Sequence, residues 1–99
     1  MKNKFEKIQI AEVLEELGLP ANSEYLGYAI HRPDTDEYLA AFKDNNGAEL
    51  WGWAKSPQLA MKYGDYNKVL ADAERYDKAP TMVGLVFDVG NQLIFVSQS

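Results

Sequence analysis

The chain contains no cysteine and a single histidine among its 99 residues. A protein without thiols has no disulfide framework, no cysteine-ligated zinc and no cysteine nucleophile. One histidine also excludes a metal site built from several histidines. The sequence therefore predicts a fold that is stabilised by its hydrophobic core, with no metal site and no cofactor.

Basic residues are scarce as well. Lys and Arg total 10 against 15 Asp and Glu, which gives a formal net charge of −5. Binding to nucleic-acid phosphates requires a surplus of positive charge. We therefore expect no direct binding to nucleic acid.

Long hydrophobic stretches are missing too. No run of apolar residues approaches the roughly 20 that a membrane-spanning helix needs. The first residues include Lys2, Lys4 and Glu6 and lack the apolar stretch of a signal peptide. With 46% hydrophobic and 25% charged residues, the composition is typical of a folded protein. These features predict one cytoplasmic domain, 1–99, that does not enter a membrane.

Apolar side chains recur at helical spacing in the first segment, about 4–17: Ile10, Val13, Leu14 and Leu17. Asn3 and Glu6 have the spacing of a capping box at its start. Gly18 is placed to end the helix, with Leu19 packing back against it.

Three strand-like runs follow at 25–32, 37–43 and 49–54. Asn46-Gly47 between the last two is a strong hairpin signal, because both residues tolerate a positive φ. We interpret the three runs as an antiparallel meander.

A second helical region begins at Ser56-Pro57, where Ser56 supplies a cap and Pro57 presets φ. Gly64 is expected to break this helix, and Asp65 caps another whose apolar stripe is Tyr66, Val69, Leu70, Ala73 and Tyr76. Two strands, 81–89 and 92–97, flank a turn at Gly90-Asn91, and their apolar character predicts central places in the sheet. The order α-β-β-β-α(α)-β-β indicates an α+β domain, with helices packed on a mostly antiparallel sheet of about five strands.

Side chains alternate between the two faces of a strand. In the meander this alternation gives one face of large side chains: Tyr28, Ile30, Tyr38, Phe42, Trp51 and Trp53. It gives an opposite face of mostly small ones: Gly27, Ala29, Leu39, Ala41, Gly52 and Ala54. The aromatic face is either the core, or, if helices pack on the small face, partly an exposed binding surface.

Polar groups concentrate in the turn that follows the first strand. His31 beside Asp34 or Asp36 has the composition of a general acid–base pair. A calcium loop is not indicated, because Tyr38 stands where the next ligand is needed and the required Gly is absent. A solvated turn with Asp34 closing an Asx hydrogen bond explains the same residues. No serine has a nucleophile motif, so no catalytic residue is assigned.

Acidic residues form two clusters at helical spacing. The first comprises Glu12, Glu15 and Glu16, and the second comprises Asp65, Asp72, Glu74 and Asp77. Such faces either mimic nucleic-acid phosphates toward a basic groove or are solvated helix surfaces that serve solubility.

The stretch 28–39, Tyr-Ala-Ile-His-Arg-Pro-Asp-Thr-Asp-Glu-Tyr-Leu, is followed by Trp53, Ser56-Pro57, Ala60 and Tyr63. Over about 25–75 this pattern resembles small proteins encoded in phages and prophages of Gram-positive bacteria. Most such proteins have no assigned activity, so the resemblance transfers no functional residue. It implies a place in the cytoplasm of a bacterial host cell. Some small acidic phage proteins inhibit host defence, including anti-CRISPR proteins.

Three functional hypotheses result. The first is a small non-enzymatic protein-binding or regulatory module, an accessory protein of phage or prophage origin. It would be a monomer or a homodimer that binds a protein partner through Tyr38, Phe42, Trp51 and Trp53. The second is an acidic inhibitor of a nucleic-acid-binding defence enzyme, with contacts from Glu12, Glu15 and Glu16. The third is a small enzyme that uses His31 with Asp34 or Asp36.

Overall fold

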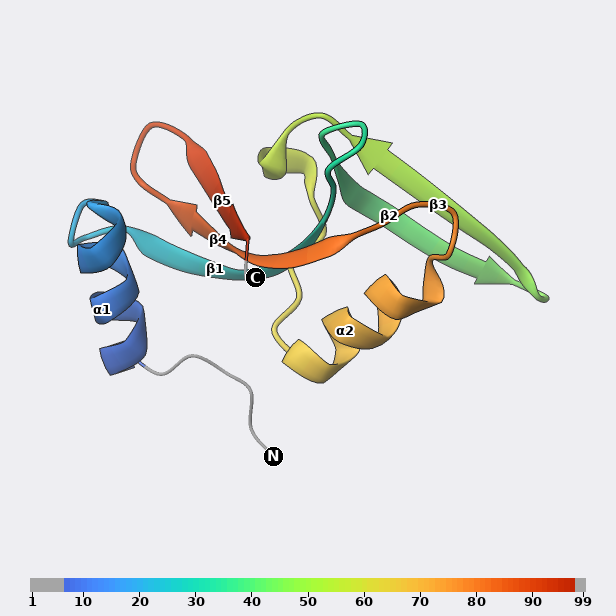
Figure 1. The fold of residues 1–99 in the computed structure, drawn as a ribbon, viewed down its shortest axis with the longest axis horizontal. Coiled ribbons are helices and arrows are strands. Elements are labelled where there is room, and N and C mark those ends of the chain that lie inside the picture. Colours follow the sequence, from blue (N-terminus) through green and yellow to red (C-terminus); the bar gives the residue numbers. More distant parts are fainter. Residues whose placement is uncertain (1–6, 98–99) are drawn as a thin grey trace.

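The computed structural model describes residues 7–97 and places five antiparallel strands in one sheet of order β3-β2-β1-β4-β5 (Figure 1). The elements are α1 (Lys7–Leu17), β1 (Glu24–Arg32), β2 (Glu37–Asn45), β3 (Ala48–Ala54), the 3₁₀ turn η1 (Pro57–Leu59), α2 (Tyr66–Arg75), β4 (Met82–Asp88) and β5 (Leu93–Ser97). This arrangement confirms the α+β class and the order of elements. The meander of the first three strands is also confirmed.

The C-terminus of α1 forms a Schellman motif. Leu19 donates its backbone N–H to the carbonyl of Leu14 at 2.9 Å, and Gly18 donates to Glu15 at 3.1 Å. Gly18 has a φ of 70°, a conformation that glycine adopts without steric penalty. The prediction for this helix end is therefore confirmed. The proposed capping box of Asn3 and Glu6 lies outside the described residues.

The β2–β3 hairpin closes at Asn46 and Gly47, which have φ values of 54° and 86°. Positive φ at both positions is the geometry of a type I′ turn, whose twist matches that of the flanking strands. The Asp44 side chain accepts a hydrogen bond from the Gly47 N–H at 3.2 Å. The sequence prediction for this turn is confirmed.

Strands β1 and β2 separate soon after the turn that joins them. They pair only at His31–Tyr38 and Arg32–Glu37. Beyond that point, the extended segment 61–63 lies between them. We call this segment the insert strand.

Backbone hydrogen bonds join the insert strand to both neighbours. Tyr28 and Tyr63 exchange two bonds of 2.8 Å, and Met61 donates to the carbonyl of Leu39 at 2.9 Å. The expected helix from Ser56 to Gly64 is therefore wrong beyond its first turn. The extended chain satisfies the backbone groups of two separated strands, which a helix cannot do.

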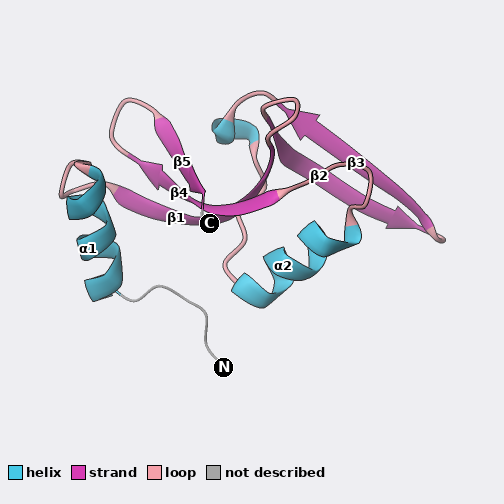
Figure 2. Ribbon diagram, viewed as in Figure 1, coloured by secondary structure: helices cyan, strands magenta, loops and turns pink. Residues whose placement is uncertain are grey.

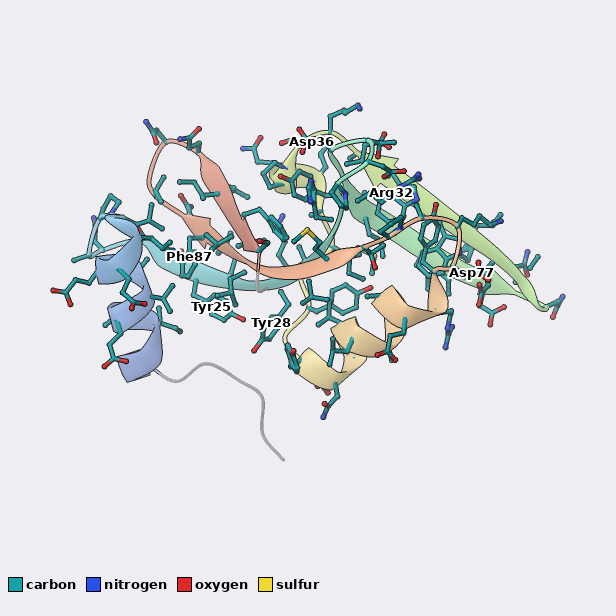
Figure 3. The ribbon with its side chains drawn as sticks, viewed as in Figure 1. Tyr25, Tyr28, Arg32, Asp36, Asp77 and Phe87 are labelled. Atoms are coloured by element: carbon teal, nitrogen blue, oxygen red, sulfur yellow. The ribbon has the colours of Figure 1, made fainter. Side chains whose placement is uncertain are left out.

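Hydrophobic cores lie on both faces of the sheet. Both helices cover one face and η1 covers the other (Figure 2). The larger core, under the helices, includes Leu14, Tyr28, Ile30, Val69 and Phe87. The smaller core, beside η1, comprises Ala29, Ala60 and Val86. The interpretation that helices pack on the small face is therefore wrong, and Tyr28 and Phe87 point to the helix side (Figure 3).

The two C-terminal strands occupy different positions in the sheet. Strand β4 is internal, as predicted, but β5 forms an edge. The β5 side chains Leu93 and Phe95 pack against the smaller core, and the Phe95 ring occupies the space above Gly84. A side chain at Gly84 would overlap with this ring and with the Val96 carbonyl. Among residues 7–97, neither helix is long and apolar enough to cross a membrane.

Replacement of Gly27 tests the insert strand directly. Gly27 has a φ of 133°, and a Cβ built there would lie 2.7 Å from the Tyr63 carbonyl oxygen. We expect Gly27→Ala to lower the free energy of unfolding by about 3 kcal/mol, through backbone strain and steric overlap. Urea denaturation measures this change. Gly64→Ala is the control, because a Cβ at Gly64 meets nothing within 4 Å. Equal effects of the two changes would contradict the close approach of Tyr63 to Gly27.

Candidate protein-interaction surface

The β2–β3 hairpin presents three aromatic side chains on the helix face of the sheet. Phe42 and Trp51 are cross-strand neighbours with ring centroids 4.3 Å apart, and Trp53 is the next residue on that face of β3. Tyr76, at the C-terminal end of α2, packs edge-on against Trp51 and Trp53 with centroid distances of 5.0 and 4.9 Å. Tyr76 is buried, whereas the other three side chains stay partly exposed. We call these four residues the aromatic cluster.

Two arginines lie over the rings of the aromatic cluster. The guanidinium carbon of Arg32 is 5.2 Å from the Trp53 ring and 5.5 Å from the Tyr76 ring. Arg75 is 5.4 Å from the Phe42 ring. At these distances the negative faces of the rings attract the cations. The guanidinium groups therefore form part of the same surface as the rings.

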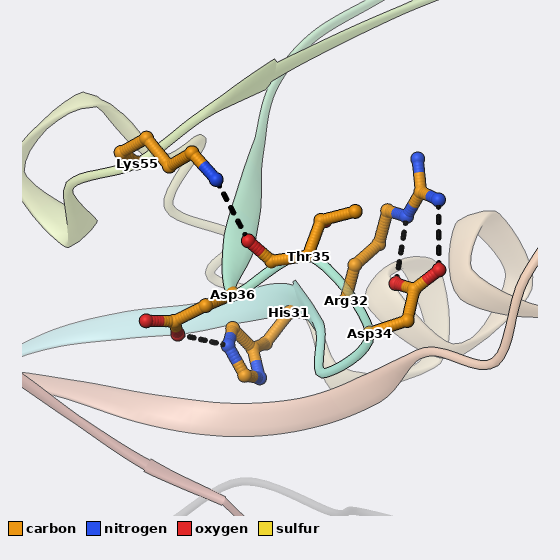
Figure 4. Close-up of polar contacts among 6 residues, drawn as sticks. All are labelled: His31, Arg32, Asp34, Thr35, Asp36 and Lys55. Carbon is orange, nitrogen blue, oxygen red and sulfur yellow. Dashed lines mark hydrogen bonds and ion pairs between the residues drawn. The ribbon is translucent and has the colours of Figure 1, made fainter.

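An acidic partner orients Arg32 further. Its Nε and Nη2 atoms donate to the two carboxylate oxygens of Asp34 at 3.2 and 3.0 Å (Figure 4). This hydrogen bonding holds the pKa of Asp34 below its ordinary value, so the carboxylate stays charged at neutral pH. Arg32 and Asp34 thus form a bidentate ion pair at the edge of the cluster.

Tyr38 lies on the opposite face from Phe42, so the prediction that the two share a face is wrong. The register between β2 and β3 shifts between Leu39 and Ala41. One extra residue in β2 reverses the alternation of side chains beyond it. Leu39 therefore faces the helices, and Tyr38 packs against the smaller core.

His31 is enclosed by aromatic rings on that opposite face. Its ring centroid is 4.8 Å from that of Tyr38 and 5.2 Å from that of Phe95. Its Nε2 lies 2.9 Å from an Asp36 carboxylate oxygen, and the side chains of His31 and Asp36 are 15% and 84% exposed (Figure 4). Burial, together with the charge of Asp36, raises the pKa of Tyr38. Asp34 and Asp36 thus bind different basic side chains, and the structure does not bring both to His31.

The acidic residues of α1 are exposed, as a contact face requires. Glu12, Glu15 and Glu16 all face solvent, while Leu14 is buried against the sheet. Helix α1 and the β2–β3 hairpin lie at opposite ends of the long axis of the molecule (Figure 1). The two surfaces are therefore separate and can be altered independently.

Asp72 is a buried carboxylate that sequence reasoning assigned to an exposed acidic face. It is only 6% exposed, and the Tyr63 hydroxyl donates a 2.8 Å hydrogen bond to it. Burial, followed by this contact with Asp72, raises the pKa of Tyr63. The sequence spacing does indicate this burial, because Asp72 lies three residues after Val69 and four before Tyr76, on the apolar face of the helix.

The Tyr63–Asp72 bond holds the insert strand against α2, and Tyr63→Phe tests it. Removing the hydroxyl leaves the buried carboxylate without this donor, so we expect a loss of roughly 2 kcal/mol in unfolding free energy. Chemical denaturation measures this loss. Tyr66→Phe is the matched control, because the Tyr66 ring packs at a tilt against Tyr28 and remains partly exposed. If both variants match the wild type, the hydrogen bond does not stabilise the fold.

Comparisons with protein-family models, with curated proteins and with solved structures give no match to this chain. The resemblance to small phage and prophage proteins therefore stays a prediction.

Proposed function

We propose that this protein is a small non-enzymatic protein-binding module whose contact surface is the aromatic cluster with Arg32 and Arg75. The observation that carries the proposal is the gathering of both tryptophans of the chain, a tyrosine and two arginines at one end of the molecule. Trp, Tyr and Arg are the residues most enriched among those that dominate binding energies at protein interfaces.

The packing of the cluster suits it for binding. Edge-on packing against Tyr76 fixes the two indole rings, and Asp34 fixes the guanidinium of Arg32. Side chains that are ordered before association lose little conformational entropy when a partner docks. The partly exposed rings and charged groups also give an apolar centre with a polar rim, which is the usual anatomy of an interface.

The biological setting is part of the proposal. The resemblance over about 25–75 supports an accessory or regulatory role for a phage or prophage protein in a bacterial host. An enzyme that uses His31 has less support, because the ring is packed between Tyr38 and Phe95 and is bonded to Asp36. These contacts favour a role of His31 in holding the β1–β2 turn.

Capture from a lysate of Gram-positive cells, followed by titration of the purified partner, tests the surface. We expect Trp51→Ala to weaken binding about thirtyfold, the effect of losing an interface anchor worth roughly 2 kcal/mol. Leu59→Ala is the control, because Leu59 is 66% exposed and lies on η1. Thermal unfolding of each variant separates lost contacts from lost structure. A folded Trp51→Ala protein with wild-type affinity would contradict the proposal.

A second candidate function is inhibition of a nucleic-acid-binding defence enzyme by the acidic face of α1. The observation that favours it is the exposure of Glu12, Glu15 and Glu16 in a chain of net charge −5. Reversing these charges to lysine would then weaken binding of the same partner, and added salt would weaken it further. Sensitivity to Trp51→Ala with no response to charge reversal assigns binding to the aromatic cluster. The opposite pattern assigns binding to α1.

A further inference from the structure

Strand β3 forms an edge of the sheet whose outer side carries free backbone groups. In the described part of the chain, its one strand neighbour is β2. Within residues 7–97, no other backbone hydrogen bond involves Ala48–Ala54. The other edge, β5, has η1 packed beside it. Natural edge strands are commonly protected by proline, lysine or a covering element, and β3 contains neither residue.

The hairpin fixes which groups point outward. In a two-residue hairpin, the residues that flank the turn, Asn45 and Ala48, are a hydrogen-bonded pair. Because such pairs alternate along an antiparallel ladder, the N–H and C=O groups of Glu49, Trp51 and Trp53 point away from β2. A new strand at this edge must form its hydrogen bonds with these three residues.

The sequence of this edge is complementary to itself in one antiparallel register. A two-fold axis at Gly52 pairs Trp51 with Trp53 of the second copy, so the outward groups of both strands meet. The same register places Glu49 opposite Lys55 of the second copy, which brings opposite charges together at both ends of the interface. Within one chain, Glu49 lies 3.8 Å from Arg75 and Lys55 donates to the Thr35 carbonyl, so the new pairs would share these groups. Gly52 has no side chain to obstruct the axis, and the atoms nearest to a Cβ built there belong to Ala41 of the neighbouring strand.

A neighbouring register lacks this complementarity. An axis at Trp51 satisfies the same backbone alternation, but it places Glu49 opposite Trp53 and Lys55 opposite Gly47. No charges are then paired. The register about Gly52 is the better match, because it pairs both the outward backbone groups and the opposite charges.

We propose that two copies of this chain pair their β3 edges antiparallel about Gly52, so that the two sheets become one continuous sheet. Such an interface is isologous and closes on itself, which limits the assembly to a dimer. It uses the backbone edge of β3, so it does not rest on binding by the aromatic cluster. In the dimer, the clusters of both copies lie on the same face of the shared sheet.

A charge exchange tests the proposal. In sedimentation velocity over a wide dilution series, we expect wild-type dimer to dissociate at low concentration. Lys55→Glu sets like charges opposite each other at both ends of the interface, so the dissociation constant rises about tenfold or more. The double variant Glu49→Lys/Lys55→Glu restores opposite charges and returns the dimer. Both variants lose the 2.8 Å hydrogen bond from Lys55 to the Thr35 carbonyl, and the double variant also loses the 3.8 Å ion pair between Glu49 and Arg75. A return of the dimer despite this further loss therefore assigns the rescue to charge pairing across the interface. A wild-type protein that is monomeric throughout would overturn the proposal.

Cross-linking tests the register, because the natural chain has no cysteine. Gly52→Cys places two thiols opposite each other at the axis, where Cα atoms of a non-hydrogen-bonded pair lie about 4.5 Å apart, within disulfide range. Leu50→Cys is the matched control, because Leu50 is 57% exposed on the same strand but faces Ala54 of the second copy. We expect mild oxidation to link the Gly52→Cys protein much faster. Equal rates, or faster linking of the control, would overturn this register.

Discussion

The insert strand is the constraint on which the rest of the fold depends. Strands β1 and β2 share only two residue pairs, and residues 61–63 supply backbone partners where these strands have separated. Buried backbone groups without partners are strongly unfavourable, so the separation and the insertion must form together. The hydroxyl of Tyr63 then reaches Asp72 and connects the same segment to α2. Sheet, insert strand and helix thus form one cooperative unit.

The insertion also determines what the β2–β3 hairpin exposes. Once β2 leaves β1, the hairpin extends from the body of the sheet and contacts α2 through Tyr76 (Figure 1). The register shift between Leu39 and Ala41 turns Phe42 toward the helices and Tyr38 away from them. The hairpin therefore carries a partly covered aromatic surface and an open backbone edge. Both features suit recognition of another polypeptide, one through side chains and the other through the main chain.

Local features of the fold were predictable from the sequence, whereas features set by distant contacts were not. Gly18, Asn46-Gly47 and Asp65 act through neighbours a few residues away, so their spacing predicts the turns and caps found. The expected helix after Pro57 fails because distant strands compete for its backbone groups. Trp51, Trp53 and Phe42 do share a face, but Tyr38 does not, because alternation alone does not reveal a bulge. Glu12, Glu15 and Glu16 are exposed, as helical periodicity indicates.

The central claim is that residues 61–63 form a strand between β1 and β2. Amide hydrogen exchange followed residue by residue by NMR tests it most directly. We expect the amides of Tyr28, Met61 and Tyr63 to exchange slowly and together, since all three donate across the sheet. Nuclear Overhauser contacts between Tyr28 and Tyr63 would accompany this protection. Rapid exchange at these amides, or sequential helical contacts throughout 57–63, would contradict the claim.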